Sequence, residues 1–165
     1  MRFRKNNRLK KHDYTKPGNY FVTIRVQDMH CVLGHIAEND MVLNKFGLIV
    51  VDQLSWLNDH YDFVELNEFV VMPNHVHAIV RISPRGSEQS PLSLSQLIGA
   101  FKTLSCTRLR KYGLNDFSWH RSFYDRIIRH QTEYDITADY IRNNPKRWSS
   151  KYNRSATSRS RSGRA

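Results

Sequence analysis

Apolar and polar residues alternate in several short segments of the chain. The clearest segment runs from Tyr20 to Val26, where Tyr20, Val22, Ile24 and Val26 share one face. Successive side chains of a β-strand point to opposite faces of its sheet, so this alternation is typical of a half-buried strand. Apolar segments bounded by turn residues extend the prediction to five strands, over residues 20–26, 31–36, 64–72, 75–82 and 123–128.

Three other segments repeat their apolar residues at helical spacing. The first runs from Asn44 to about His60, with Phe46, Val50 and Leu54 on one face. A helix needs a polar side chain at its start to satisfy free backbone N–H groups. Suitable residues precede each segment: Asn44, Ser93 with Gln96, and Thr132 with Asp135. We therefore predict helices over residues 44–60, from 93 to about 111, and from 132 to a stop at Pro145.

The order of these elements predicts the fold class. A β-rich start is followed by helix, two strands, helix, strand and helix, which favours an α+β protein over a repeating βαβ unit. We expect a ferredoxin-like antiparallel sheet with the helices packed on one face. At 165 residues the chain has enough apolar content for one hydrophobic core, so a single domain is predicted over residues 19–148.

Charge is concentrated outside this predicted domain. Residues 1–18 carry seven basic and one acidic side chains, and residues 142–165 carry eight basic and none acidic. The stretch between them holds 11 basic and 14 acidic residues, so its net charge is −3. Basic arms attract polyanions, which makes nucleic acid the expected partner. Neither arm contains an amphipathic basic helix, so a membrane is disfavoured. The basic, Ser/Arg-rich tail over 149–165 is predicted to be disordered, and its segment Ser155–Ala165 is equally compatible with a solvated appendage.

Two cysteines, Cys31 and Cys106, are too few and too far apart for a disulfide framework or a cysteine zinc motif. No signal peptide or transmembrane run precedes them, so we expect a reducing, cytoplasmic environment. Both cysteines lie among apolar residues and are predicted to fill the core rather than to react.

His75 and His77 are the first candidates for chemistry. They lie two apart on a predicted strand, so both side chains point to one place, while Val76 and Ala78 form the opposite, apolar face. Imidazole suits zinc, nickel, copper or manganese, whereas magnesium needs oxygen ligands beside it. With eight histidines in the chain, a chance His-x-His pair is a real alternative to a metal site.

Tyr140 and Asn144 are the second candidates. On the last predicted helix they lie four apart at the edge of a face formed by Tyr134, Ala138 and Ile141, so both can reach one site. The alternative is ordinary packing, in which the tyrosine ring lies on the sheet and its hydroxyl stays in water.

Two segments carry a resemblance to a known family. Residues 69–77, Phe-Val-Val-Met-Pro-Asn-His-Val-His, resemble the HUH signature of single-tyrosine transposases of the insertion-sequence and REP-associated type. Residues 140–148, Tyr-Ile-Arg-Asn-Asn-Pro-Lys-Arg-Trp, are similar to the Tyr-Ile-x-x-Asn-Pro segment of that family. The resemblance extends from about Tyr14 to Trp148, and includes residues 17–23 and 123–128.

This resemblance implies an HUH endonuclease fold and a specific chemistry. Tyr140 would be the nucleophile that cuts single-stranded or hairpin DNA through a 5′-phosphotyrosine, and His75, His77 and Asn144 would bind Mg²⁺ or Mn²⁺. For DNA contacts we expect basic and aromatic residues of the two ends: Arg2, Arg4, Lys5, Tyr14, Arg142, Lys146 and Arg147. Either a monomer or a homodimer is compatible with the resemblance, which also implies a bacterial protein that associates with the nucleoid.

Three other interpretations compete with a transposase. A non-catalytic or domesticated single-stranded nucleic-acid-binding protein could keep the same residues unused. A histidine-type nucleotide hydrolase would need a further histidine where Ile79 stands. A replication initiator or relaxase shares the motif logic, but the short chain and the Tyr-x-x-x-Asn-Pro segment favour the transposase.

Overall fold

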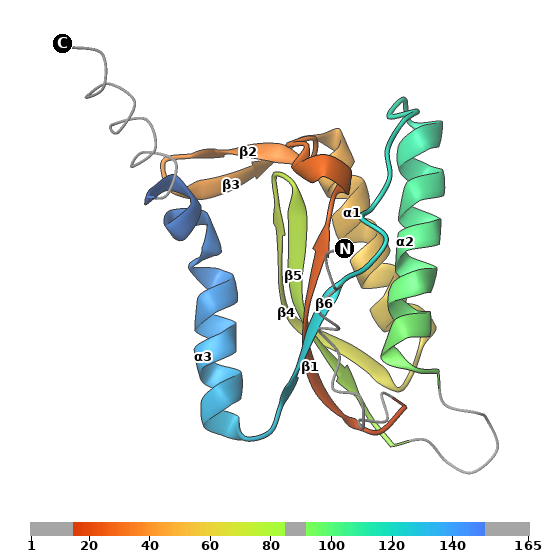
Figure 1. Ribbon diagram of the computed structural model, residues 1–165, viewed down its shortest axis with the longest axis vertical. Helices are drawn as coiled ribbons and strands as arrows, with labels where there is room; N and C mark the ends of the chain where they lie inside the picture. Colours follow the sequence, from red (N-terminus) through yellow and green to blue (C-terminus); the bar gives the residue numbers. More distant parts are fainter. Residues whose placement is uncertain (1–14, 85–91, 151–165) are drawn as a thin grey trace, which may run out of the picture.

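Four antiparallel strands form the central sheet of the computed structural model, which describes residues 15–84 and 92–150 (Figure 1). Their order across the sheet is β4–β5–β1–β6. The strands are β1 (Gly18–Arg25), β4 (Val64–Met72), β5 (His75–Ile82) and β6 (Tyr124–Ile128). A tight turn at Pro73 and Asn74 joins β4 to β5, and β1 pairs with both β5 and β6. The first predicted strand, the two central ones and the last one are therefore confirmed.

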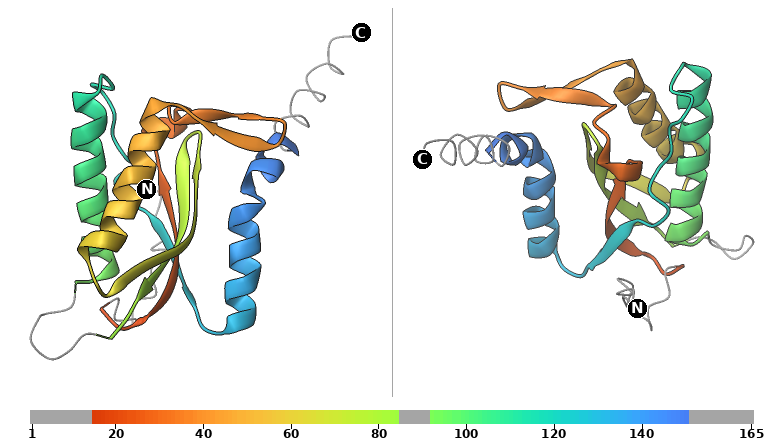
Figure 2. Two further views of the ribbon diagram at one scale, coloured as in Figure 1. Left: turned by 180° about the vertical axis from the view of Figure 1, so that it is seen from behind. Right: turned by 45° about the horizontal axis from the view of Figure 1, so that its top comes forward.

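Three helices cover the sheet, but not on one face. Helices α1 (Lys45–His60) and α2 (Leu94–Lys111) lie together on one side, whereas α3 (Gln131–Arg142) stands on the other (Figures 1 and 2). The α+β class with an antiparallel sheet is confirmed, and the expectation that all helices share one face is corrected. The physical reason is the pleat of the sheet, which sends apolar residues to both faces.

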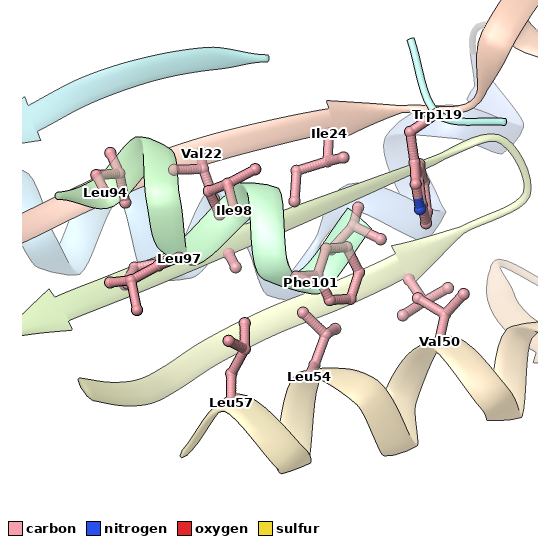
Figure 3. Close-up of a cluster of buried hydrophobic side chains, with 14 of the residues drawn as sticks. Val22, Ile24, Val50, Leu54, Leu57, Leu94, Leu97, Ile98, Phe101 and Trp119 are labelled. Carbon is pink, nitrogen blue, oxygen red and sulfur yellow. The ribbon is translucent and has the colours of Figure 1, made fainter. Parts of the chain in front are cut away.

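The larger core lies between the sheet and the α1–α2 layer. Val22 and Ile24 of β1 point into it, and Phe101 of α2 is fully buried there (Figure 3). Figure 3 also labels further contributors from α1 and α2, among them Val50, Leu54, Leu57, Leu94, Leu97 and Ile98. A smaller apolar cluster holds α3 on the opposite face, and consists of Phe21, Ile79, Ile128, Ala138 and Ile141.

The helix starts follow the predicted caps in two of three cases. Asn44 accepts hydrogen bonds from two backbone N–H groups of α1, and Ser93 with Gln96 forms the capping box of α2. The cap of α3 was wrongly assigned to Thr132, because the side chain of His130 accepts from the backbone of Glu133 instead.

The chain does not leave helical structure at Pro145. Helix α3 ends at Arg142, the backbone kinks at Asn143, and residues 144–150 are helical again. Pro145 lies in the first turn of this second segment, where its missing N–H would have no partner. The predicted stop at Pro145 is therefore corrected to a break at Asn143, and Asn144 begins the second helical segment.

A short β-hairpin replaces the strand predicted over residues 31–36. It pairs β2 (Gly34–Ala37) with β3 (Asp40–Leu43), after a 3₁₀ turn, η1 (Gln27–Met29). Gly34 has a φ of 147°, and a Cβ there would lie 2.2 Å from the carbonyl oxygen of Val42. This close approach fixes where the hairpin begins. Cys31 precedes it and is exposed, which corrects its placement in the core, while Cys106 is half-buried.

Candidate active site and metal centre

The pleat of β5 separates the two histidines from the apolar core. Val76 and Ala78 are buried against the α1–α2 layer, whereas His75 and His77 point to the face that α3 covers. Both imidazoles are nonetheless buried, with 8% and 6% of their surface exposed. The predicted division of this strand into an apolar face and a histidine face is therefore confirmed.

The two imidazoles converge on one point. Their Nε2 atoms lie 3.1 Å apart. Two nitrogen donors about 2.1 Å from one ion, at a right angle to each other, would be about 3.0 Å apart. The spacing therefore fits a pair of adjacent ligands to one metal ion.

Hydrogen bonds to the outer ring nitrogens fix the orientation of both imidazoles. Asn74 donates from Nδ2 to the carbonyl of Met29 at 3.0 Å, which turns its Oδ1 toward Nδ1 of His75 at 2.8 Å. An amide oxygen can only accept, so the proton of His75 is on Nδ1 and the Nε2 lone pair faces the site. The hydroxyl of Thr23 lies 2.9 Å from Nδ1 of His77. A hydroxyl can donate or accept, so His77 can offer a lone pair to a metal as well.

Both imidazoles are uncharged at neutral pH. Burial, with the positive charge of Arg25 as the second cause, lowers the pKa of His75 to about 4. Burial likewise lowers the pKa of His77 to about 3, with His75 as the second cause. Neutral imidazole is the form that binds a metal, so the lone pairs are available without the loss of a proton.

Asn144 is the third residue at this point. It is 6% exposed, and its side chain is among the groups that set the pKa of His75, which places it beside that imidazole. Among residues 15–84 and 92–150, no group of three or more His, Cys, Asp or Glu side chains is placed to hold a metal ion. A metal at the histidine pair would therefore use two imidazole nitrogens and the amide oxygen of Asn144, which are all neutral donors.

Helix α3 places Tyr140 beside these ligands. Its ring lies 5.3 Å from that of His77, edge to face, and 6.0 Å from that of Phe21. Phe21 in turn stacks on His77 at 5.3 Å. Thr137, Ala138 and Ile141 are buried, so Tyr140 projects from the edge of the helix that packs on the sheet. Tyr134, predicted to share a face with Ala138 and Ile141, is half-buried and packs against the same apolar cluster.

The predicted DNA-binding residues fall into three groups. Arg147 is exposed and lies over the ring of Tyr140, with 5.1 Å from Cζ to the ring centre, and Lys146 is also exposed. Arg142 forms ion pairs with Glu68 of β4 and with Asp139, so it is not placed at the histidines. Arg2, Arg4, Lys5 and Tyr14 lie outside the described residues, as do most of the two basic arms.

Several residues at the site were not predicted from the sequence. Thr23 and Arg25 reach it because β1 pairs with β5, in a register that sets Thr23 opposite His77 and Arg25 opposite His75. The Trp148 ring lies 5.7 Å from that of His75. Tyr20, by contrast, is 1% exposed and donates to the Lys16 carbonyl. The alternation along β1 placed Thr23 and Arg25 on the same face of the strand. The sequence did not show which residues of β5 they would lie opposite.

Comparison with known sequences identifies several relatives. The family described as IS200-like transposases matches residues 26–144. An uncharacterised protein of Haemophilus influenzae is 34% identical over 161 residues, covering 88% of this chain and 89% of the relative. A candidate REP-associated tyrosine transposase of the same organism is 24% identical over 139 residues, covering 81% of this chain and 73% of that protein.

Solved structures share the fold. A REP-associated tyrosine transposase bound to a REP hairpin superimposes with a TM-score of 0.62 at 22% identity, covering 85% of this chain and 73% of that one. A candidate transposase from Deinococcus radiodurans gives a TM-score of 0.52 at 19% identity, over 82% and 97% of the two chains. Both comparisons concern the arrangement of the elements, and they agree with the sheet and helix layers described above. No helix of the described residues has the length and apolar content needed to cross a membrane.

Proposed function

The chain belongs to the family of IS200-like transposases, and from that premise we propose that it cuts and rejoins single-stranded DNA with Tyr140 as nucleophile. The observation that carries the proposal is the contact between the Tyr140 ring and His77, whose Nε2 meets that of His75 at 3.1 Å. A nucleophile and a metal-binding pair side by side are the two parts that this chemistry requires.

The proposed step is an exchange of phosphodiesters. The Tyr140 oxygen attacks phosphorus, the bond from phosphorus to the 3′ oxygen breaks, and a 5′-phosphotyrosine remains with a free 3′-hydroxyl. The phenol loses one proton and the departing 3′ oxygen gains one, so the step is balanced. Another 3′-hydroxyl can reverse it, which joins strands without an external energy source.

A divalent metal would make this attack feasible at neutral pH. When bound, it would polarise a non-bridging phosphate oxygen and stabilise charge on the leaving oxygen. His75, His77 and Asn144 are the residues that would hold it. Two nitrogen donors favour manganese, while the amide oxygen and water would also permit magnesium, so we propose either ion.

The substrate is proposed to be a single strand or a hairpin. One solved relative of the same fold was bound to a REP hairpin, which supports this choice. The guanidinium of Arg147 lies over the Tyr140 ring and Lys146 is exposed next to it in sequence, so phosphates close to the nucleophile would meet positive charge.

The test is covalent trapping. Labelled hairpin DNA with single-stranded flanks, incubated with the protein and Mn²⁺ or Mg²⁺, is expected to give a protein–DNA adduct that resists denaturant. Tyr140→Phe should abolish the adduct and leave binding nearly unchanged, because only the attacking oxygen is lost. Tyr134→Phe is the matched control, since Tyr134 is a half-buried tyrosine of the same helix.

Each other outcome has a clear meaning. An adduct that persists in Tyr140→Phe and disappears in Tyr134→Phe would move the nucleophile to Tyr134. Tight hairpin binding without an adduct, at any metal, would favour the non-catalytic binding protein. An adduct that forms equally well with a chelator present would contradict the metal-dependent mechanism.

A further inference from the structure

Arg25 lies at the histidine pair, and the proposed function does not use it. It is the last residue of β1 and stands directly opposite His75 in the antiparallel register. Residues opposite one another in such a pair share a face of the sheet, so Arg25 is on the side of the two histidines. Its side chain is exposed, and its charge acts on His75 strongly enough to lower that pKa.

Other arginines of the sheet and of α3 are neutralised by a carboxylate. Arg81 pairs with Glu65, Arg126 with Glu133, and Arg142 with Glu68. Within the part of the chain that the structure describes, Arg25 makes no such ion pair. The guanidinium beside the candidate metal ligands is therefore available to an anion from outside.

The charge of the complete site points to the same anion. Imidazole and amide side chains are neutral when they bind a metal, so a divalent ion held by His75, His77 and Asn144 would keep its full positive charge. Arg25 adds a further positive charge opposite His75. A site that gathers this much positive charge is stabilised when a phosphodiester enters, and an arginine binds phosphate oxygens in a fixed fork.

We propose that Arg25 binds a non-bridging oxygen of the phosphodiester that Tyr140 attacks. The inference rests on the proposed function, and it adds a further catalytic residue to it. Arg25 is opposite His75, whereas the Tyr140 ring packs on His77. The phosphate would thus lie across the histidine pair, with the nucleophile at one end and the guanidinium at the other.

The experiment removes the charge either from Arg25 or from the phosphate that it is proposed to bind. Arg25→Gln and Arg25→Lys are made in the full chain, with Arg108→Gln as the matched control, because Arg108 is an exposed arginine on α2, in the layer opposite the site. Each protein is tested with hairpin DNA that carries either a normal phosphate or a single neutral methylphosphonate at the cleaved linkage. Affinity is measured in the Tyr140→Phe background, so that no adduct forms.

The expected result is specific to the phosphate. Arg25→Gln should weaken binding of the normal hairpin about tenfold, as expected for loss of a charge-assisted hydrogen bond. The same variant should barely change the affinity for the methylphosphonate hairpin, because that linkage has no negative charge for Arg25 to bind. With an intact Tyr140, adduct formation should slow about 10²- to 10³-fold, and Arg25→Lys should restore affinity better than rate.

Two results would overturn the proposal. In the first, Arg25→Gln weakens binding of both hairpins by the same factor, which would place Arg25 on another phosphate. In the second, Arg25→Gln behaves no differently from Arg108→Gln. Thermal melting shows whether the variants are folded, and Arg25→Lys keeps the test valid if Arg25→Gln is not. The affinity arm needs no catalysis, so it decides the role of Arg25 even if the wild-type protein forms no adduct and the proposed function fails.

Discussion

The two faces of the central sheet are built from alternate residues of the same strands, yet they differ in almost every physical property. Along β1, Val22 and Ile24 are buried in the core under α2, whereas Thr23 and Arg25 lie on the face of the histidines. Along β5 the same alternation separates Val76 and Ala78 from the histidine pair. One face is apolar and closed, and the other is polar, aromatic and partly open.

The difference shows how a small domain divides stability from chemistry. The face under α1 and α2 gathers most of the large buried side chains, while five buried apolar residues form the cluster under α3. Burial of apolar surface is the main stabilising contribution, so the first face should determine whether the chain folds. The second face can then keep polar groups whose burial is unfavourable in itself.

Among the variants that compare the two faces, Phe101→Ala should have the largest effect on the free energy of unfolding. Phe101 is fully buried, and its ring lies 5.6 Å from that of Trp119. Truncation of a buried phenylalanine lowers the free energy of unfolding by about 3–5 kcal/mol. Chemical denaturation should show this loss, while the metal affinity of the protein that remains folded stays unchanged.

Phe21→Ala is the matched variant on the other face. Phe21 is 8% exposed and belongs to the smaller cluster, so we expect a smaller loss of stability than for Phe101→Ala. Its ring packs on both His77 and Tyr140 and helps to hold them in place, so adduct formation should slow even where the protein is folded. Equal losses of stability in the two variants, with adduct formation unaffected in both, would show that the faces do not divide the two tasks.

The second prediction removes a metal ligand. An ion present at 100 times its dissociation constant stabilises the folded protein that binds it by about 2.7 kcal/mol. Mn²⁺ should therefore raise the melting temperature of the wild-type chain. His75→Ala and His77→Ala should abolish this increase, and Asn144→Ala should reduce it. His35→Ala is the control, since His35 is exposed on the β2–β3 hairpin. If the increase survives loss of either imidazole, the metal is bound elsewhere.

Local signals predicted much of the fold. Helices α1 and α2 begin where Asn44 and Ser93 supply a cap, and the turn at Pro73 separates β4 from β5 as expected. The β2–β3 hairpin was missed because its strands are four residues long and depend on the close approach at Gly34. The side of the sheet that α3 covers could not be predicted either, because it depends on which residues of paired strands share a face.

The residues of the candidate site were also predictable only where local spacing or the resemblance indicated them. The spacing of His75 and His77 already placed them away from the core, and the resemblance supplied Tyr140 and Asn144. Nothing in the local sequence indicated Arg25, because its position beside His75 exists only through the β1–β5 register. Long-range pairing is thus the information that the sequence pattern lacked.

The third prediction exchanges the chemistry of two neighbouring residues. Val22→Thr puts a hydroxyl into the closed face and should lower the free energy of unfolding by about 1–3 kcal/mol, without a change in metal affinity. Thr23→Val removes the hydroxyl beside Nδ1 of His77 and should weaken metal binding about 10- to 100-fold, with little change in stability. Calorimetric titration with Mn²⁺ and urea denaturation measure the two quantities. The reversed pattern would contradict the assignment of the faces.

The smallest effect should come from the ion pair that ties α3 to the edge of the sheet. Glu68 of β4 pairs with Arg142, whose side chain is 59% exposed, so water screens the interaction and Glu68→Gln should barely change thermal stability. The variant also releases a basic side chain on α3, the helix that carries Tyr140. If Arg142 then meets a phosphate of the bound strand, the slope of log affinity against log salt should steepen by at most about 0.7. Asp139→Asn is the control, because Arg142 would keep its partner on β4. An unchanged slope would mean that DNA does not reach this end of the α3 face, and would confine its path to the histidine pair, Lys146 and Arg147.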